Sequence, residues 1–201
     1  MNDHSPLSAA EAEDRALVDR VAGKDQQAFR CLYERHYDRV FRFLFSLTRR
    51  YEIAEESAND VFLVLWESAA SFKGESAVST WLMGIAYRKG LKQLEQLRRF
   101  RKSEPFPHSP AANEPFQASN EPTKELELED WILAGLRELP FEQRTVVELT
   151  YFWGHAYEEI ALILDCPVNT VKTRMFHARR KLRSILPSLE ATPKPPQSIK
   201  S

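Results

Sequence analysis

A basic segment near the C-terminus has the residue types needed to bind nucleic acid. Residues 166–186 contain no aspartate or glutamate, and their basic side chains are Lys172, Arg174, Arg179, Arg180, Lys181 and Arg183. A helix by itself favours acidic residues in its first turn, so helix stability does not explain this bias. Nearby phosphates do explain it, because each phosphate that a basic side chain neutralises releases counterions. The segment is therefore predicted to contact a nucleic acid.

The pattern around this segment, residues 156–186, is that of a helix-turn-helix. A short helix is expected at 157–164, and Pro167 then forces a turn before a second helix at 169–186, with Asn169 as its N-cap. One stripe of the second helix is apolar and is expected to pack inward: Val171, Met175, Ala178 and Leu182. The opposite face is predicted to enter the major groove of DNA and carries Asn169, Thr170, Lys172, Thr173, Phe176, His177 and Arg180.

Particular base contacts follow from these residue types. Lys172 is suited to guanine O6 or N7, and Phe176 or the Thr173 methyl group is suited to a thymine methyl. The alternative interpretation is an ordinary solvated amphipathic helix that is basic near its C-terminus.

A second basic surface is expected on a helix that begins near Ser79 and extends to about residue 102. Its side chains are Arg88, Lys89, Lys92, Arg98, Arg99, Arg101 and Lys102, against the single acid Glu95. A loop of five residues precedes this helix: Phe72, Lys73, Gly74, Glu75 and Ser76. An aromatic beside a basic residue in such a loop suits an unstacked base, and the glycine permits unusual backbone angles. The alternative is that Phe72 and Trp81 are core aromatics.

The fold is predicted to be all-α, with two small helical domains at 11–102 and 124–186. Apolar residues at steps of three and four predict helices at 11–22 with Gly23 as C-cap, from the N-cap Asp25 to about 47, at 53–70, at 79–102, at 124–138 and at 140–154. Residues 103–123 contain five prolines and are expected to be a flexible linker. Acidic side chains dominate residues 104–130, so the linker is not expected to bind DNA. The tail, 187–201, is expected to be disordered.

Several classes of protein are excluded by the sequence. The 5 histidines are scattered without metal-ligand spacing, and the adjacent acid pairs at 55–56 and 158–159 point about 100° apart on their helices. An enzyme, a metal site and a cofactor are therefore not expected. No run of about 18 apolar residues predicts a membrane span, and the first ten residues lack the pattern of a signal peptide. The expectation is a cytoplasmic protein without membrane insertion.

Taken in order, several motifs resemble an extracytoplasmic-function sigma factor of the sigma-70 family of bacterial RNA polymerase. The resemblance covers about 17–186 and rests on Leu17-Val18-Asp19-Arg20, Ala54-Glu55-Glu56, Asn59-Asp60-Val61-Phe62, Phe72-Lys73-Gly74-Glu75-Ser76, Thr80-Trp81-Leu82, Ile85-Ala86, Leu139-Pro140, Tyr157-Glu158-Glu159-Ile160-Ala161 and Cys166-Pro167-Val168-Asn169-Thr170-Val171-Lys172-Thr173-Arg174. Each motif alone is moderately specific, whereas their order and spacing together are strongly so.

The resemblance implies a function and partners for each domain. The first domain would be sigma region 2, in which Asn59, Asp60 and Phe62 dock on core RNA polymerase. The loop from Phe72 to Ser76, with Arg88 and Lys92, would melt and read the -10 promoter element. The second domain would be sigma region 4, which reads the -35 element through the helix-turn-helix face. An anti-sigma protein is implied as a further partner.

Three residues depart from the pattern of the family. Arg88 stands where an asparagine is common, and Lys92 where an acidic or polar residue is common, which affects the details of -10 base selection. Asn59 replaces a usual glutamine. Ala156 replaces a serine at the N-cap of the helix at 157–164, a change that costs on the order of 1 kcal/mol.

Two other functions are compatible with parts of the pattern. A DNA-binding regulator would bind duplex operators without touching polymerase, but its sensor domain would normally offer a ligand pocket or a phosphorylation site, and the N-terminal block has neither pattern. An adaptor without DNA binding would not need an acid-free recognition helix. Co-purification with core polymerase separates the regulator from the sigma factor.

Overall fold

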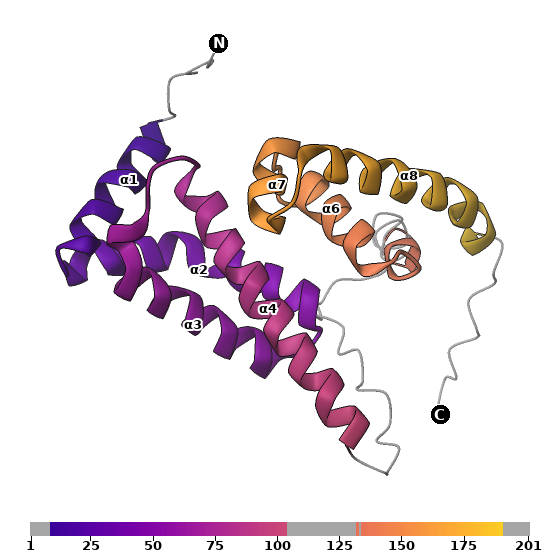
Figure 1. Ribbon diagram of the computed structural model, residues 1–201, viewed down its shortest axis with the longest axis horizontal. Coiled ribbons are helices and arrows are strands. Elements are labelled where there is room, and N and C mark those ends of the chain that lie inside the picture. Colours follow the sequence, from indigo (N-terminus) through magenta and orange to yellow (C-terminus); the bar gives the residue numbers. More distant parts are fainter. Residues whose placement is uncertain (1–8, 104–131, 133, 191–201) are drawn as a thin grey trace, which may run out of the picture. The chain divides into compact units, whose positions relative to one another are not determined.

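The computed structural model describes residues 9–103, 132 and 134–190, and every regular element in these ranges is a helix (Figure 1). The described helices belong to two compact units. One unit contains α1 to α4, and the other contains α6 and α8. The prediction of an all-α fold with two helical domains is therefore confirmed.

The first two helices are joined by a tight, well-capped turn. α1 spans Ala9–Ala22 and α2 spans Gln26–Thr48. Asp25 is the N-cap of α2, as predicted, and its carboxylate accepts hydrogen bonds from the backbone N–H groups of Gln27 and Ala28 at 2.9 and 3.1 Å. The left-handed residue that ends α1 is Lys24, with φ 66°, and not the preceding Gly23. The N–H groups of Lys24 and Asp25 donate to carbonyls of the last turn of α1, which completes a Schellman motif.

The next two helices flank the loop that the sequence singled out. α3 spans Tyr51–Ser68 and is followed by the 3-10 helix η1, Ala69–Ser71. α4 spans Val78–Ser103, so the helix includes the first residue of the predicted linker. The rest of that linker and most of the helix expected at 124–138 lie outside the described residues.

The core of the first unit is formed where α2 packs against α1, α3 and α4. The apolar stripes predicted for α2 and α3 are buried there, with Phe43, Leu44, Ala58 and Leu65 fully shielded from solvent. A polar pair is also enclosed: Asp14 of α1 and His36 of α2 are 5% and 8% exposed, and the Nε2 atom of His36 lies 2.8 Å from an oxygen of Asp14. The four helices α1 to α4 thus enclose one mainly apolar core.

The second unit is built around the packing of α6 against α8. α6 spans Phe141–Tyr151, α7 spans Tyr157–Leu164 and α8 spans Val168–Glu190. Because α8 begins at Val168, Asn169 lies inside the first turn, and the prediction that Asn169 is the N-cap is wrong. α8 also continues four residues into the segment predicted as a tail, so Pro187, which has no backbone N–H to donate, lies within the helix.

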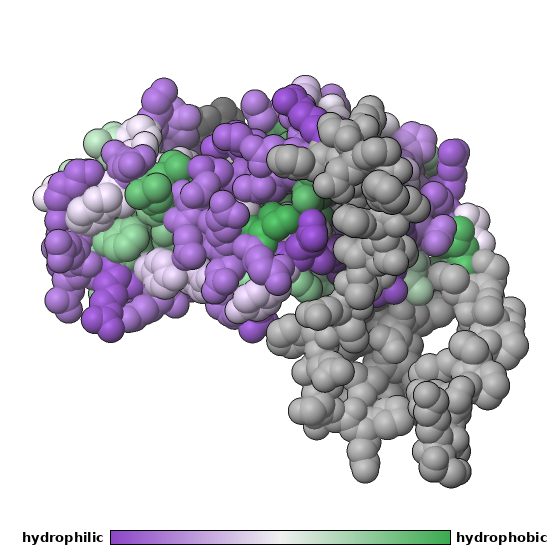
Figure 2. Space-filling model, turned by 90° about the horizontal axis from the view of Figure 1, so that it is seen from below, coloured by the Kyte–Doolittle hydropathy of each residue, from purple (hydrophilic) through white to green (hydrophobic). Residues whose placement is uncertain are grey.

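One face of the described surface is mostly hydrophilic. Figure 2 shows one face on which purple, hydrophilic residues predominate and green patches interrupt them. Exposed large apolar side chains in the first unit are Tyr51, Leu63 and Leu91. Among the described residues, no helix is both long and apolar enough to cross a lipid bilayer.

Candidate nucleic-acid interface

The turn between α7 and α8 orients the second helix of the predicted helix-turn-helix. Asp165 adopts a left-handed conformation with φ 50°, and the carbonyl of Pro167 accepts the backbone N–H of Thr170 at 2.8 Å. The N-terminus of α7 lacks the serine that is usual in the family, but the Glu159 carboxylate accepts the N–H of Ala156 at 3.0 Å. This bond supplies one half of a capping box and satisfies a donor at the start of α7.

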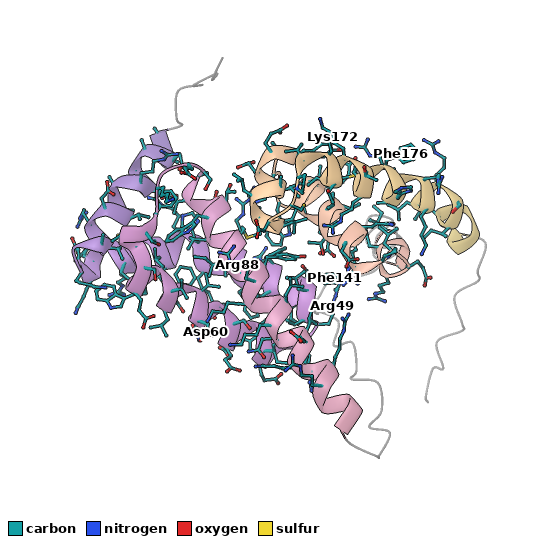
Figure 3. The ribbon with its side chains drawn as sticks, in the orientation of Figure 1. Arg49, Asp60, Arg88, Phe141, Lys172 and Phe176 are labelled. Carbon is teal, nitrogen blue, oxygen red and sulfur yellow. The ribbon has the colours of Figure 1, made fainter. Side chains whose placement is uncertain are left out.

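α8 packs on the rest of its unit by the stripe that the sequence predicted. Val171, Met175 and Ala178 are buried, and Leu182 is half-buried. The opposite face is open, because Asn169, Lys172, Thr173, Phe176 and Arg180 are exposed and Thr170 and His177 are half-buried. Lys172 and Phe176 project from the same side of α8 (Figure 3). The residues predicted to read DNA therefore share one accessible face.

Phe176 is an exposed aromatic at the centre of this face. Its side chain is 61% exposed, and its ring makes an edge contact with the ring of His177 at 5.4 Å between centroids. The Thr173 hydroxyl donates to the Asn169 carbonyl of the same helix at 2.9 Å. An exposed Phe contributes little to the stability of the fold, so its presence here suits contact with an apolar group of a ligand, such as a thymine methyl.

Acidic side chains of the described residues do not pair with the exposed cations of α8. Lys172, Arg180 and Arg183 are exposed and make no ion pair within the described part of the chain. Arg179 donates from Nη2 to the Tyr151 hydroxyl of α6 at 2.7 Å, and this hydrogen bond raises the pKa of its guanidinium. A neutral phenol orients the arginine without neutralising it. The hydrogen bond between Arg179 and Tyr151 was not anticipated from the sequence, because 28 positions separate the two residues.

The cations and Phe176 line one shallow groove on this unit, together with Tyr157 from the start of α7. The groove is lined by Tyr157, Lys172, Met175, Phe176, Arg179, Arg180 and Arg183. A concave, positively charged surface with an aromatic floor attracts a polyanion and contacts its apolar parts at the same time. This arrangement fits a DNA backbone beside a base edge.

The loop before α4 joins η1 to the second basic surface. Phe72 and Trp81 are both half-buried and their rings lie 5.0 Å apart, so they form a pair at the edge of the core. Gly74 has φ 69°, a conformation that favours glycine. Lys73 and Glu75 are exposed, while Ser76 is half-buried. The loop therefore presents one aromatic edge and two charged side chains to solvent.

The basic surface on α4 is smaller than the sequence suggested. Arg88 and Lys92 are exposed one helical turn apart, and Figure 3 shows Arg88 on α4. Lys89, however, forms an ion pair at 2.8 Å with Asp60 of α3, and Arg99 pairs with Glu95. Because Lys89 pairs with Asp60 and Arg99 pairs with Glu95, Arg88 and Lys92 are exposed cations of α4 with no ion pair among the described residues.

The residues expected to bind a protein partner occupy different environments on α3. Asn59 is exposed, and its side-chain oxygen accepts from the Tyr33 hydroxyl at 3.4 Å. Asp60 is partly exposed and engages Lys89. Phe62 is only 1% exposed, and its ring centroid lies 4.7 Å from that of Tyr33. Its side chain therefore packs beneath the exposed residues of this surface.

An apolar groove lies beside Asn59 and was not anticipated. It is lined by Gln26, Phe29, Tyr33, Asn59, Phe62, Leu63 and Trp66. Leu63 is 52% exposed, and the rings of Phe29 and Trp66 meet edge to face at 5.4 Å. Only the packing of α2 on α3 shows that these residues line one surface.

Two family models match the chain in the order of its two units. The model described as Sigma-70 region 2 matches residues 32–100, and the model described as Sigma-70, region 4 matches residues 129–182.

Relatives of known function match over most of their length. The ECF RNA polymerase sigma-E factor of Haemophilus influenzae is 32% identical over 183 residues, which cover 88% of this chain and 96% of that protein. The sigma-E factor of Escherichia coli is 34% identical over 180 residues, with coverage of 84% and 92%. The RNA polymerase sigma-H factor of Pseudomonas aeruginosa is 28% identical, with coverage of 88% and 95%.

Two solved structures have the same fold. CnrH, solved in complex with the cytosolic domain of CnrY, has a TM-score of 0.62 at 26% identity and covers 88% of this chain and 98% of its own. The sigma factor RpoE of Bartonella quintana, solved with the anti-sigma factor NepR, has a TM-score of 0.63 at 26% identity, with coverage of 79% and 96%.

Proposed function

This chain belongs to the extracytoplasmic-function sigma factors of the sigma-70 family, which direct promoter recognition by RNA polymerase, and on that premise we propose a separate role for each of its exposed surfaces. α8 reads the -35 element. The loop from Phe72 to Ser76 with Arg88 and Lys92 reads and melts the -10 element. The surface around Asn59 and Asp60, supported by Phe62, binds core polymerase.

The -35 role is carried by one observation: α8, which has no acidic residue before Glu190, displays exposed cations and a 61% exposed Phe176 on one face. Lys172 lies near the N-terminus of α8, where a recognition helix reaches base edges in the major groove. Arg179, Arg180 and Arg183 lie two to three turns further along, where phosphate contact is expected. The start of α8 therefore contacts base edges, and the part towards its end contacts phosphates.

The -10 role is supported by the chemistry of the loop. Opening a duplex requires a site that holds an unstacked base, because unstacking costs a few kcal/mol. The half-buried pair of Phe72 and Trp81 offers an aromatic surface, and Lys73, Arg88 and Lys92 supply positive charge for the displaced strand. These features favour single-stranded DNA as the ligand of this surface.

The surface around Asn59 and Asp60 has the composition of a protein-binding site. Asn59 and Asp60 are polar groups next to an apolar groove, which is the composition of a protein–protein interface with an apolar centre and a polar rim. CnrH and RpoE of Bartonella quintana were solved with CnrY and with the anti-sigma factor NepR. An anti-sigma protein is accordingly proposed as a regulatory partner of this chain, and the cytoplasm as its location.

Transcription in vitro tests the proposal as a whole. The full chain is added to core RNA polymerase lacking any sigma factor, and transcripts from a genomic library of promoter fragments are mapped at their 5′ ends. The expected result is a set of start sites that share sequence blocks near -35 and -10 and depend on the added chain. Failure of the chain to co-purify with core polymerase, or start sites without shared blocks, would contradict it.

A further inference from the structure

The loop from Phe72 to Ser76 is anchored to the first helix of the protein as well as to α4. The guanidinium Nη2 of Arg15 donates to the backbone carbonyl of Ser76 at 3.1 Å. The Glu11 carboxylate accepts the backbone N–H of Val78, also at 3.1 Å. These two contacts span 61 and 67 positions of the sequence.

Glu11 supplies the N-terminal cap that α4 lacks in its own sequence. Val78 is the first residue of α4, and its N–H has no acceptor inside the helix. The nearby Ser76 hydroxyl donates to the Ala77 carbonyl at 3.2 Å. A carboxylate at this position also interacts favourably with the positive end of the helix dipole. The start of α4 is therefore held by a charged group from another helix.

Arg15 and Glu11 act as one unit. The Nε atom of Arg15 donates to Glu11 at 3.0 Å, and the two side chains are 29% and 13% exposed. The same guanidinium lies under Gly74, where an added Cβ atom would come within 3.2 Å of Nη1. The ion pair thus touches the loop at Gly74 and Ser76 and touches α4 at Val78.

The loop consequently has an anchor at each end. Phe72 at its start packs on Trp81 with ring centroids 5.0 Å apart, and Ser76 at its end is held by Arg15. Lys73 and Glu75, between the anchors, are exposed. The backbone is thus held on both sides of these two exposed side chains.

We propose that Glu11 and Arg15 are positioning residues for the -10 loop: they hold it in the conformation that receives an unstacked base. The inference rests on the proposed role of the loop in reading the -10 element. When a loop must be ordered during binding, the apparent affinity is the intrinsic affinity multiplied by the fraction of molecules already in the competent state. Holding the loop in advance removes that loss for every base that the loop receives.

The test uses the full chain assembled with core polymerase. Arg15→Ala removes the contact to Ser76, and Glu11→Gln keeps an oxygen for the Val78 N–H but breaks the ion pair. Arg20→Ala is the matched control, since it removes an arginine ion pair, with Asp25, from the same helix without touching the loop. Three quantities are measured: affinity for a single-stranded -10 oligonucleotide, discrimination against single-base changes in it, and affinity for a -35 duplex.

The expected result is selective. If about a tenth of the molecules keep the competent loop, Arg15→Ala lowers single-strand affinity about tenfold, by the same factor for every base. Glu11→Gln lowers this affinity by a smaller factor. Affinity for the -35 duplex stays within about twofold for all three variants, and Arg20→Ala behaves like the parent protein.

Two outcomes would overturn the inference. One is unchanged single-strand affinity in both Arg15→Ala and Glu11→Gln. The other is a loss that follows the thermal unfolding midpoint across all three variants, the control included, because that would be general destabilisation. A Lys73→Ala variant distinguishes the positioning role of Glu11 and Arg15 from the -10 role of the loop itself. If Lys73→Ala weakens single-strand binding and Arg15→Ala does not, only the positioning role fails; if neither does, the -10 assignment of the loop fails too.

Discussion

Replacing Lys172 with alanine is expected to weaken promoter binding while leaving the fold intact. The side chain is exposed, and within the described part of the chain its ammonium makes no ion pair or hydrogen bond. Exposed substitutions of this kind usually change stability by about 0.5 kcal/mol or less. Any large effect on binding is therefore an effect on the DNA contact itself.

The size of the effect distinguishes a base contact from a phosphate contact. A lysine that reads a base edge contributes about 1–3 kcal/mol, or about 5- to 150-fold in affinity, and its loss relaxes preference at one position of the -35 element. If Lys172 instead neutralises a phosphate, its loss makes the slope of log affinity against log salt concentration shallower by about 0.9. The loss of affinity on substitution is then about 3.5-fold larger at about 50 mM salt than at about 200 mM salt.

The assay is fluorescence anisotropy of the polymerase holoenzyme on a labelled promoter fragment, repeated over a salt series and over -35 variants. The control is Lys181→Ala, which removes one positive charge from the same helix. The Lys181 ammonium already donates to the Glu138 carbonyl, so a smaller loss of affinity is expected. Unchanged affinity, salt slope and base preference in Lys172→Ala would refute the placement of α8 in the major groove.

Three further predictions concern the first unit. Asp60→Arg should lower affinity for core polymerase by at least about tenfold, because a reversed charge at an interface costs several kcal/mol; competition between sigma variants for core measures it. Gly74→Ala should lower the free energy of unfolding by about 1–2 kcal/mol in urea titrations, since a Cβ atom is strained at φ 69° and meets Arg15 at 3.2 Å. Stability should fall as pH drops below about 6.5, because burial lowers the pKa of His36 despite the nearby Asp14, so the unfolded chain takes up that proton first. Urea titrations at pH 7.5 and 5.5 test this dependence.

Each of these variants has a matched control in the chain. Lys89→Met breaks the same ion pair as Asp60→Arg without reversing a charge on α3, and it should retain affinity for core polymerase. Gly154→Ala introduces a Cβ atom at φ 70° with nothing within 4 Å, so it should show the backbone strain alone. His36→Gln should reduce the pH dependence of stability. An equal loss in the two glycine variants, or a pH dependence unchanged by His36→Gln, would contradict the respective explanation.

The sequence was sufficient to predict what short-range chemistry decides. Apolar residues at steps of three and four identified α1 to α4 and α6 to α8, because one face of each helix must be buried. Asp25 was recognisable as an N-cap from its residue type and position alone. The acid-free face of α8 was visible in the same way, since charge along one helix needs no knowledge of the partner helix.

Predictions that depended on a single residue at a helix end were less secure. Asn169 has the side chain of an N-cap, yet α8 begins at Val168. Gly23 has the freedom to adopt a left-handed conformation, yet Lys24 adopts it. Helix ends shift by a residue when packing favours it, so side-chain preference alone does not locate them.

The sequence by itself determined that this chain is helical, that it has two parts and that one helix near its C-terminus displays positive charge. Only the tertiary structure decided which charges remain available, because pairs such as Asp60 with Lys89 join side chains from different helices. The same holds for Glu11 and Arg15, which reach the loop across more than 60 positions of sequence. Helical periodicity is set by bonds between residues four apart, whereas these contacts exist only once the helices have packed.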